Sequence, residues 1–249
     1  MKRLDEYWYS QNPVAWLLLP VTALYCSLVF LRRFLFRAGL FKSFALPVPV
    51  IIVGNISVGG TGKTPLLIAL CDLLRSQGYR PGVISRGYGG DFAGEHLLKD
   101  SDTADAVGDE PCLIHARTDC PLVVGKDRVA AAEHLLANTD CNIVLSDDGL
   151  QHYRLRRDIE IAIVDTKRQF GNGFCLPSGP LREPVARLNQ VDFVVDHCTD
   201  TSTSLRNNNF SLKFSDAVNL KTNKLRSLDE FKGSPVHAVA GIGHPARFF

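Results

Sequence analysis

Eight consecutive residues combine the groups that hold a nucleotide's phosphates. They are Ser57, Val58, Gly59, Gly60, Thr61, Gly62, Lys63 and Thr64. The glycines permit backbone conformations that are closed to other residues, so successive N–H groups can point at an anion. Lys63 supplies a mobile positive charge, and Thr64 offers a hydroxyl to phosphate-bound Mg²⁺. The stretch therefore predicts a loop that binds nucleotide phosphates.

The segments on either side of this loop have the order that the motif requires. Val50–Val53 is an unbroken β-branched run, typical of a buried parallel strand. Thr64–Gln77 has an apolar helical face and is followed by Gly78, a common helix stop. Ser57 stands where the usual pattern has its first glycine. A glycine-rich turn with a chance Gly-Lys-Thr is the alternative, and the strand–loop–helix order argues against it.

Two acidic pairs are candidates for the metal and proton chemistry of phosphoryl transfer. Asp147 and Asp148 follow the apolar run Ile143–Leu145, as in a second phosphate-loop motif that holds Mg²⁺ directly or through water. Asp109 and Glu110 precede a proline, so they either cap a helix or provide a general base and a metal ligand. The local sequence leaves both interpretations open.

Further polar residues could contact a sugar phosphate. The run Ser85–Gly90 joins a cation, an aromatic ring and small glycines, so Tyr88 could stack on a sugar and Arg86 could pair with phosphate. The Pro/Gly-rich loop Leu176–Pro184 presents an arginine, with a plain surface turn as its alternative. The candidates for substrate contact are Arg86, Tyr88, Gln151, His152 and Arg182.

The composition excludes several classes of protein. The formal net charge of the 249 residues is +2, which gives no strong field for nucleic acid, and we expect no nucleic-acid partner. The 7 cysteines form no Cys-x-x-Cys pair, and we interpret them as reduced, mostly buried thiols of a cytosolic domain. No obligate protein partner is inferred.

An apolar segment, Val14–Leu31, precedes the loop and contains no formal charge. As one helix it would be ~27 Å long, close to the hydrocarbon thickness of a bilayer. Arg32, Arg33 and Arg37 follow it, so a spanning helix would have its C-terminal end in the cytoplasm. A helix lying in the membrane interface and a buried core helix are the alternatives. Membrane contact is the preferred interpretation.

From residue 47 onward, apolar strands alternate with helical segments. The expected strands after the loop are Gly82–Ser85, Leu122–Val124, Ile143–Leu145, Ile159–Val164, Val191–Val195 and Phe210–Phe214, with a helix at Asp127–Ala137. This predicts an α/β fold, a mainly parallel sheet with flanking helices like that of P-loop NTPases, preceded by an N-terminal membrane helix. The expected divisions are an apolar membrane segment and basic flank (1–46), a kinase core (47–200), and linker strands with the start of a second domain (201–249).

These motifs, taken in order, closely resemble the tetraacyldisaccharide 4′-kinases of lipid A synthesis. The resemblance rests on Gly54-Asn55 and the loop to Pro65, Ser85–Gly90, Gly108–Pro111, Asp147–Tyr153, Gly171–Gly173, Leu176–Glu183 and Gly241–Pro245. It covers nearly the whole chain, and Ser57 is what this family has in place of the first loop glycine. The resemblance implies transfer of the ATP γ-phosphate to the 4′-hydroxyl of a tetraacylated glucosamine disaccharide 1-phosphate, the lipid A precursor. It places the reaction at the cytoplasmic face of the bacterial inner membrane.

The same resemblance implies roles for individual residues. Asp109 becomes the general base and Glu110 a residue of the Mg²⁺ site, while Asp147 and Asp148 position metal and nucleotide. Residues 57–64 become the ATP-binding loop, with Lys63 catalytic and Thr64 at the metal. The five candidates for substrate contact face disaccharide or phosphate.

The C-terminal end is the main departure from this family, whose members continue past Gly241–Pro245 into a second domain with a histidine that partners the base. The sequence ends at Phe249, so we expect a truncated member that binds ATP but turns over little. A membrane-associated switch ATPase of the partitioning type is the rival interpretation. Such proteins carry a lysine just before the loop glycines, where this chain has Val58. An inactive nucleotide-binding fragment is the third.

Overall fold

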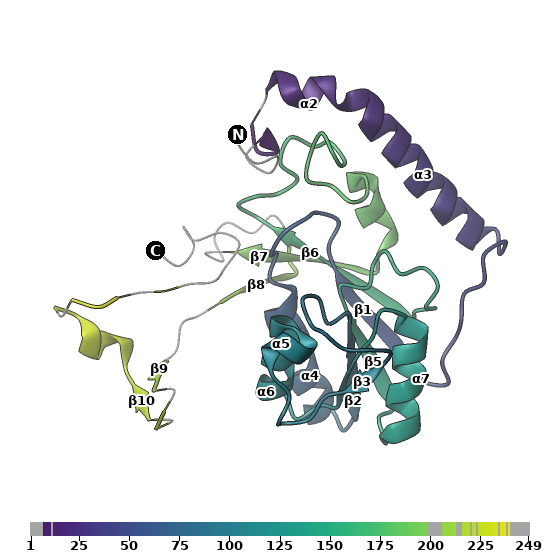
Figure 1. Ribbon diagram of the computed structural model, residues 1–249. Helices are drawn as coiled ribbons and strands as arrows, with labels where there is room; N and C mark the ends of the chain where they lie inside the picture. Colours follow the sequence, from purple (N-terminus) through teal and green to yellow (C-terminus); the bar gives the residue numbers. More distant parts are fainter. Residues whose placement is uncertain are drawn as a thin grey trace.

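The fold is built on one large, mostly parallel sheet, seen in a computed structural model that describes residues 7–10, 12–198, 206–212, 216–219, 221–222, 224–233, 235–237 and 239 (Figure 1). Neighbouring strands are parallel except for the β3–β4 pair. The spatial order is β3 (His96–Leu97), β4 (Leu122–Val124), β2 (Pro81–Ser85), β5 (Ile143–Asp147), β1 (Val50–Gly54), β6 (Ile159–Asp165), β7 (Phe193–Cys198) and β8 (Asn209–Ser211). The predicted α/β class is confirmed.

Helices cover both faces of this sheet because the central strands are apolar on both sides. On one face, α4 (Lys63–Ser76) and α6 (Asp109–Arg117) pack with Ile51, Val53 and Leu145. On the other, α7 (Arg128–Asn138) packs with Ile52 and Val144. Adjacent residues of one strand thus enter different cores, as the two-residue period of a strand requires.

The remaining elements are short. Between β2 and β4 the chain forms β3, α5 (Ala104–Val107) and α6. A 3₁₀ helix, η1 (Val185–Gln190), precedes β7. Beyond the sheet, β9 (Ala217–Val218) and β10 (Leu225–Arg226) form an antiparallel hairpin, followed by the 3₁₀ helix η3 (Leu228–Phe231).

The apolar N-terminal segment is not one continuous helix. It forms α2 (Pro13–Leu17) and α3 (Leu19–Arg37), which meet at Leu18. Pro20 lies in the first turn of α3, where the missing N–H costs nothing, so a new helix starts there. The arginines expected to follow the segment are inside α3. By length and composition alone, α3 passes as a membrane span, with a mean hydropathy of 1.5.

One side of α3 is attached to the core, and the other is exposed. The Thr22 hydroxyl donates to Ser178 Oγ at 2.7 Å and accepts from the Ser178 N–H at 3.1 Å, and the Tyr25 hydroxyl donates to the Arg182 carbonyl at 2.8 Å. Figure 1 shows α2 and α3 as a long arm along the edge of the molecule. The loop that contains Ser178 and Arg182 therefore fixes the helix to the rest of the protein.

The last two strands of the sheet have other bounds than the expected Val191–Val195 and Phe210–Phe214. His197 and Cys198 complete β7, and Asn209 begins β8, which pairs in parallel with β7. The domain boundary at residue 200 stays a prediction. The motif Gly241–Pro245 lies outside the described residues.

Candidate active site

The carboxyl ends of three adjacent parallel strands converge on one cleft of about 790 Å³. β1 runs into the phosphate-binding loop, β2 into Arg86, and β5 ends at Asp147, and β5 lies between the other two in the sheet. Ligand sites of open parallel sheets form at this edge. The sequence-predicted residues that line the cleft are Val58, Gly59, Gly60, Lys63, Arg86, Tyr88, Glu110, Asp147, Asp148, Gln151, His152 and Arg182.

The phosphate-binding loop has the backbone shape of an anion cradle. Gly59 and Gly62 have φ angles of +108° and +94°, in the region that favours glycine, and α4 begins directly at Lys63. The start of α4 therefore places its helix dipole behind the loop. The loop is also held from outside, because the Val58 N–H donates to the Pro180 carbonyl at 2.8 Å and Asn55 Nδ2 donates to Thr61 Oγ1 at 2.9 Å.

A histidine that the sequence analysis did not single out supports the loop from behind. His197, at the end of β7, is 7% exposed, and its Nδ1 lies 2.9 Å from the Thr61 carbonyl, so Nδ1 carries the proton and donates it. Its ring stacks on Phe210 of β8, with centroids 4.7 Å apart. A Cβ atom on Gly62 would lie 2.6 Å from Nδ1. Only glycine fits here.

Asp147 and Asp148 are neighbours in sequence but differ in surroundings. Asp147 is 2% exposed, and burial, reinforced by the charge of Glu110, raises its pKa to about 6. Ser85 Oγ donates to Asp147 Oδ2 at 3.2 Å. Burial also acts to raise the pKa of Asp148, but Lys63 and Arg182 outweigh it and hold the pKa below its usual value.

Asp148 is bound by two cations. Arg182 Nη1 donates to its two carboxylate oxygens at 2.9 and 2.8 Å, and Lys63 Nζ lies 3.7 Å from Oδ1. The backbone of Asp148 has φ = +47°, unusual for a non-glycine residue and characteristic of strained functional positions. Lys63 and Arg182 are thus brought together on one carboxylate, which orients both toward the cleft.

A divalent cation fits the remaining acidic groups. Within the described residues, Asp147 Oδ1 is buried with no hydrogen-bond partner, an arrangement that costs free energy unless another group compensates it. The Thr64 hydroxyl lies 3.5 Å from Glu110 Oε1 at the same end of the cleft. The described chain has no group of three or more His, Cys, Asp or Glu that could hold a metal. A cation held here would need phosphate oxygens and water to complete its shell, as is usual for Mg²⁺.

Asp109 occupies a different position from the other predicted residues. It is the first residue of α6 and is exposed, and it is not among the described residues that line the cleft. The preceding Gly108 has φ = +97°, and a Cβ there would lie 2.6 Å from the Tyr88 carbonyl. The start of α6 therefore packs directly on the Ser85–Gly90 loop, which keeps Asp109 near the cleft mouth.

The candidates for substrate contact differ in how far the protein itself already holds their side chains. Tyr88 is 85% exposed at the mouth of the cleft, and Arg86 is exposed beside it. Gln151 Nε2 donates to Glu183 Oε2 at 3.0 Å and to the Asn55 carbonyl at 3.2 Å, so its amide is fixed by the protein. Burial, followed by the charges of Arg128 and Arg86, lowers the pKa of His152 to about 4, so its imidazole is neutral at pH 7.

The cleft also contains residues that the sequence analysis missed. Tyr25, Val29 and Arg32 of α3 form one wall. Arg128 is 3% exposed and donates to the carbonyls of Asp147 at 2.9 Å and Gly125 at 3.2 Å. Arg128 could have been noticed in the sequence because it stands in the first turn of a predicted helix, where a cation opposes the helix dipole. For the α3 residues the sequence held no local signal.

Comparison with known proteins identifies the family. A sequence profile of the tetraacyldisaccharide-1-P 4′-kinases matches residues 14–249. The chain belongs to this family. The tetraacyldisaccharide 4′-kinase of Nitrosococcus oceani is 51% identical over 248 residues, which are 98% of this chain and 72% of that protein. The enzyme of Shewanella sp. (strain ANA-3) is 50% identical over 99% of this chain and 72% of its own length.

A solved member of the 4′-kinase family has the same fold. The crystal structure of LpxK from Aquifex aeolicus in complex with ATP superposes with a TM-score of 0.76 and 29% sequence identity. The superposition covers 88% of this chain and 71% of that one. The sequence-based resemblance and the predicted kinase class are therefore confirmed, and the chain is a tetraacyldisaccharide 4′-kinase of lipid A biosynthesis.

Proposed function

We propose that this cleft transfers the γ-phosphate of ATP to the 4′-hydroxyl of a tetraacylated glucosamine disaccharide 1-phosphate, at the cytoplasmic face of the bacterial inner membrane. One observation carries the proposal: the phosphate-binding loop, the acidic strand end and the polar residues expected to contact the sugar line a single cleft. ATP binding by the related Aquifex protein supports the choice of donor.

We assign the donor half of the reaction to residues 57–64. The loop N–H groups and Lys63 hold the β- and γ-phosphates, while Asp148 keeps Lys63 oriented at 3.7 Å. Thr64 and Asp147 would hold Mg²⁺, with Glu110 beside them and Asp148 on the side of the nucleotide. When bound, the cation neutralises charge that develops on the transferred phosphoryl group.

We assign the acceptor half to Asp109 and the polar rim. Asp109 accepts the proton of the attacking 4′-hydroxyl, since positioning and charge neutralisation leave that as the main chemical task for a side chain. Arg86 and Tyr88 lie at the mouth, where phosphate and sugar would enter. The neutral His152 and the fixed amide of Gln151 can offer hydrogen bonds rather than charge. Arg182 reaches the substrate while it is paired with Asp148.

The exposed side of α3 is the proposed contact with the membrane. Leu17 at the end of α2 and Val21, Leu24, Leu28 and Leu31 of α3 recur at spacings of three and four, and each is at least half exposed, from 50% to 80%. A different side of the same helix lines the cleft. A helix that borders a polar cleft through Tyr25, Val29 and Arg32 is better placed flat in the interface than across the bilayer. The acylated substrate then reaches the cleft without leaving the lipid.

Replacement of the proposed base tests the catalytic assignment. In the natural gene product, Asp109→Asn should abolish phosphoryl transfer and leave ATP affinity within a few-fold of wild type, because Asp109 is exposed and is not among the described residues that line the cleft. Glu110→Gln is the matched variant one position away, and it should weaken Mg²⁺-dependent ATP binding. A large loss of ATP affinity in Asp109→Asn would remove Asp109 from the role of base and make it a metal ligand.

A further inference from the structure

A second polar cavity, of about 410 Å³, lies next to the catalytic cleft at the C-terminal end of α3. Its lining includes Arg33, Arg37 and Gln190. Tyr153 borders both this cavity and the catalytic cleft. None of the proposed steps of phosphoryl transfer uses the cavity, so its cluster of cations requires another explanation.

Two guanidinium groups converge on one neutral oxygen in this cavity. Arg33 Nη2 and Arg37 Nη2, one helical turn apart, both donate to Gln190 Oε1, the latter at 2.8 Å. Two like charges side by side repel each other, and an amide oxygen compensates that repulsion poorly. A phosphate group offers several anionic oxygens and pairs with guanidinium groups in a bidentate manner. An anion at the position of Gln190 Oε1 would therefore bind the two arginines more strongly than the amide oxygen does.

The carboxylates of the cavity are already engaged. Glu160 accepts from Arg157 at 2.8 Å and from Arg187 at 2.6 and 2.7 Å. Asp158 accepts from a backbone N–H at 2.8 Å, and Asp192 from the Glu160 N–H at 2.7 Å.

Two cations at this site have no acidic partner among the described residues. Arg33 also lies 3.6 Å from Glu183, but Arg37 makes no ion pair within the part of the chain that the structure describes. Arg156 likewise makes none among the described residues. The cavity thus retains positive charge.

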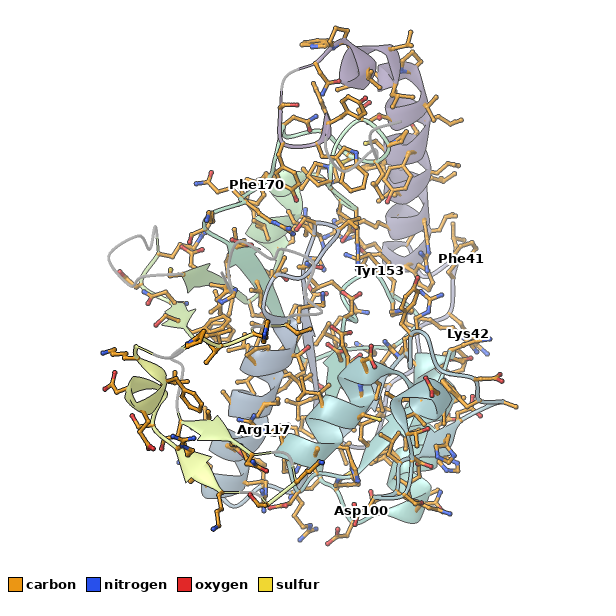
Figure 2. The ribbon with its side chains drawn as sticks, turned by 60° about the vertical axis from the view of Figure 1, so that its left-hand side comes forward. Phe41, Lys42, Asp100, Arg117, Tyr153 and Phe170 are labelled. Atoms are coloured by element: carbon orange, nitrogen blue, oxygen red, sulfur yellow. The ribbon has the colours of Figure 1, made fainter. Side chains whose placement is uncertain are left out.

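The surroundings of the arginine pair favour a lipid as the source of the phosphate. Phe34, Leu40 and Phe41 are 54%, 69% and 45% exposed at the same end of α3. Figure 2 shows Phe41 and Lys42 at this end, close to Tyr153. The ring of Phe36 connects them, with centroids 5.2 Å from Phe41 and 5.9 Å from Tyr153. Exposed apolar side chains beside a pair of arginines match the boundary between acyl chains and headgroups.

We propose that Arg33 and Arg37 bind the phosphate of an anionic membrane phospholipid, displacing Gln190 Oε1. The inference rests on the proposed membrane contact of α3, and it adds a defined headgroup site to it. A lipid bound there fixes the end of α3 at the depth of the headgroups. Because Tyr153 separates the two cavities, the catalytic cleft then opens at the same depth, where the acylated substrate carries its own phosphate.

Calorimetric titration with soluble, short-chain phosphatidylglycerol tests the site without a membrane. The comparison ligands are short-chain phosphatidylcholine and inorganic phosphate. Arg37→Gln removes one cation, and Gln190→Glu places a carboxylate between the two arginines. Each should weaken phosphatidylglycerol binding by about fivefold or more, the effect of one charge near an anionic lipid. Arg80→Gln is the matched control, because Arg80 is an exposed arginine paired with Asp140 beside the opposite ends of the strands.

The outcomes separate the possible ligands. Tighter binding of phosphatidylglycerol than of inorganic phosphate, lost in both variants and kept in Arg80→Gln, supports the lipid site. Equal binding of inorganic phosphate would make it a site for free anions and overturn the assignment. Unchanged binding by Gln190→Glu, or an equal loss in Arg80→Gln, would also overturn it. Flotation with phosphatidylcholine vesicles tests the apolar side of α3 separately, so a failure of membrane contact is recognised independently.

Discussion

Replacement of Gly62 by alanine tests the geometry of the phosphate-binding loop. Two costs add at this position. A φ of +94° is strained for any residue with a Cβ, by about 1–3 kcal/mol. The new Cβ would also lie 2.6 Å from Nδ1 of the buried His197, and overpacking of this kind costs about 1–3 kcal/mol. We expect Gly62→Ala to lower the free energy of unfolding by about 3 kcal/mol and to weaken ATP binding.

The same loop provides the control. A Cβ on Gly60 meets nothing within 4 Å, and Gly60 does not have a positive φ. Gly60→Ala should therefore leave the nucleotide-free stability unchanged, or raise it by about 0.5 kcal/mol through the entropy of the unfolded chain. Urea denaturation without nucleotide measures both variants under the same conditions.

A double-mutant cycle separates the two costs at Gly62. In a His197→Ala background the steric conflict is absent, so Gly62→Ala should cost only the backbone strain, and the coupling between the two positions should be about 1–2 kcal/mol. A Gly62→Ala variant within about 0.5 kcal/mol of wild type would refute the described loop conformation. An undiminished cost in the His197→Ala background would refute the role of His197.

Three further outcomes follow from the buried charges and the apolar helix. Asp147→Asn should stabilise the nucleotide-free chain by about 3 kcal/mol at pH 7, since burial raises the pKa of Asp147 to about 6 and disfavours its ionised form. This gain should shrink as the pH of the denaturation experiment falls from 6 to 4, and a gain independent of pH would contradict the assignment. Arg187→Met should cost about 3–5 kcal/mol in the same assay, because it leaves Glu160 buried with half of its ion pairs; a neutral result would mean that Glu160 is protonated or solvated. Leu24→Asp with Leu28→Asp should abolish flotation with vesicles, whereas Leu73→Asp, at an exposed leucine of α4, should not.

The local parts of the fold were predictable from the sequence. Val50–Val53 and the glycines after it specify a buried strand and a phosphate-binding turn through short-range chemistry, and the carboxyl ends of parallel strands must share one edge. The acidic strand end at Asp147 follows from the same rule. These features depend only on residues that are neighbours in the sequence, so they could be predicted from the local sequence pattern.

The parts that depend on distant contacts were not predictable. The sequence gives no sign that α3 forms a wall of the cleft, because its attachment is the Thr22–Ser178 pair, 156 residues apart. The role of His197 depends on a β7–β8 extension of the sheet, and 197–209 has the composition of a linker. The long charge-free run Val14–Leu31 favoured a single helix, whereas the structure starts a new helix close to Pro20.

The most direct test of the account is the fate of the γ-phosphate of labelled ATP. The natural gene product is incubated with labelled ATP, membranes, Mg²⁺ and tetraacyldisaccharide 1-phosphate. The position of the label on the lipid is then determined. The account predicts label on the 4′-oxygen of the disaccharide, and none in the lipid with Asp109→Asn. Label found only as free phosphate, or on another hydroxyl of the sugar, would contradict it.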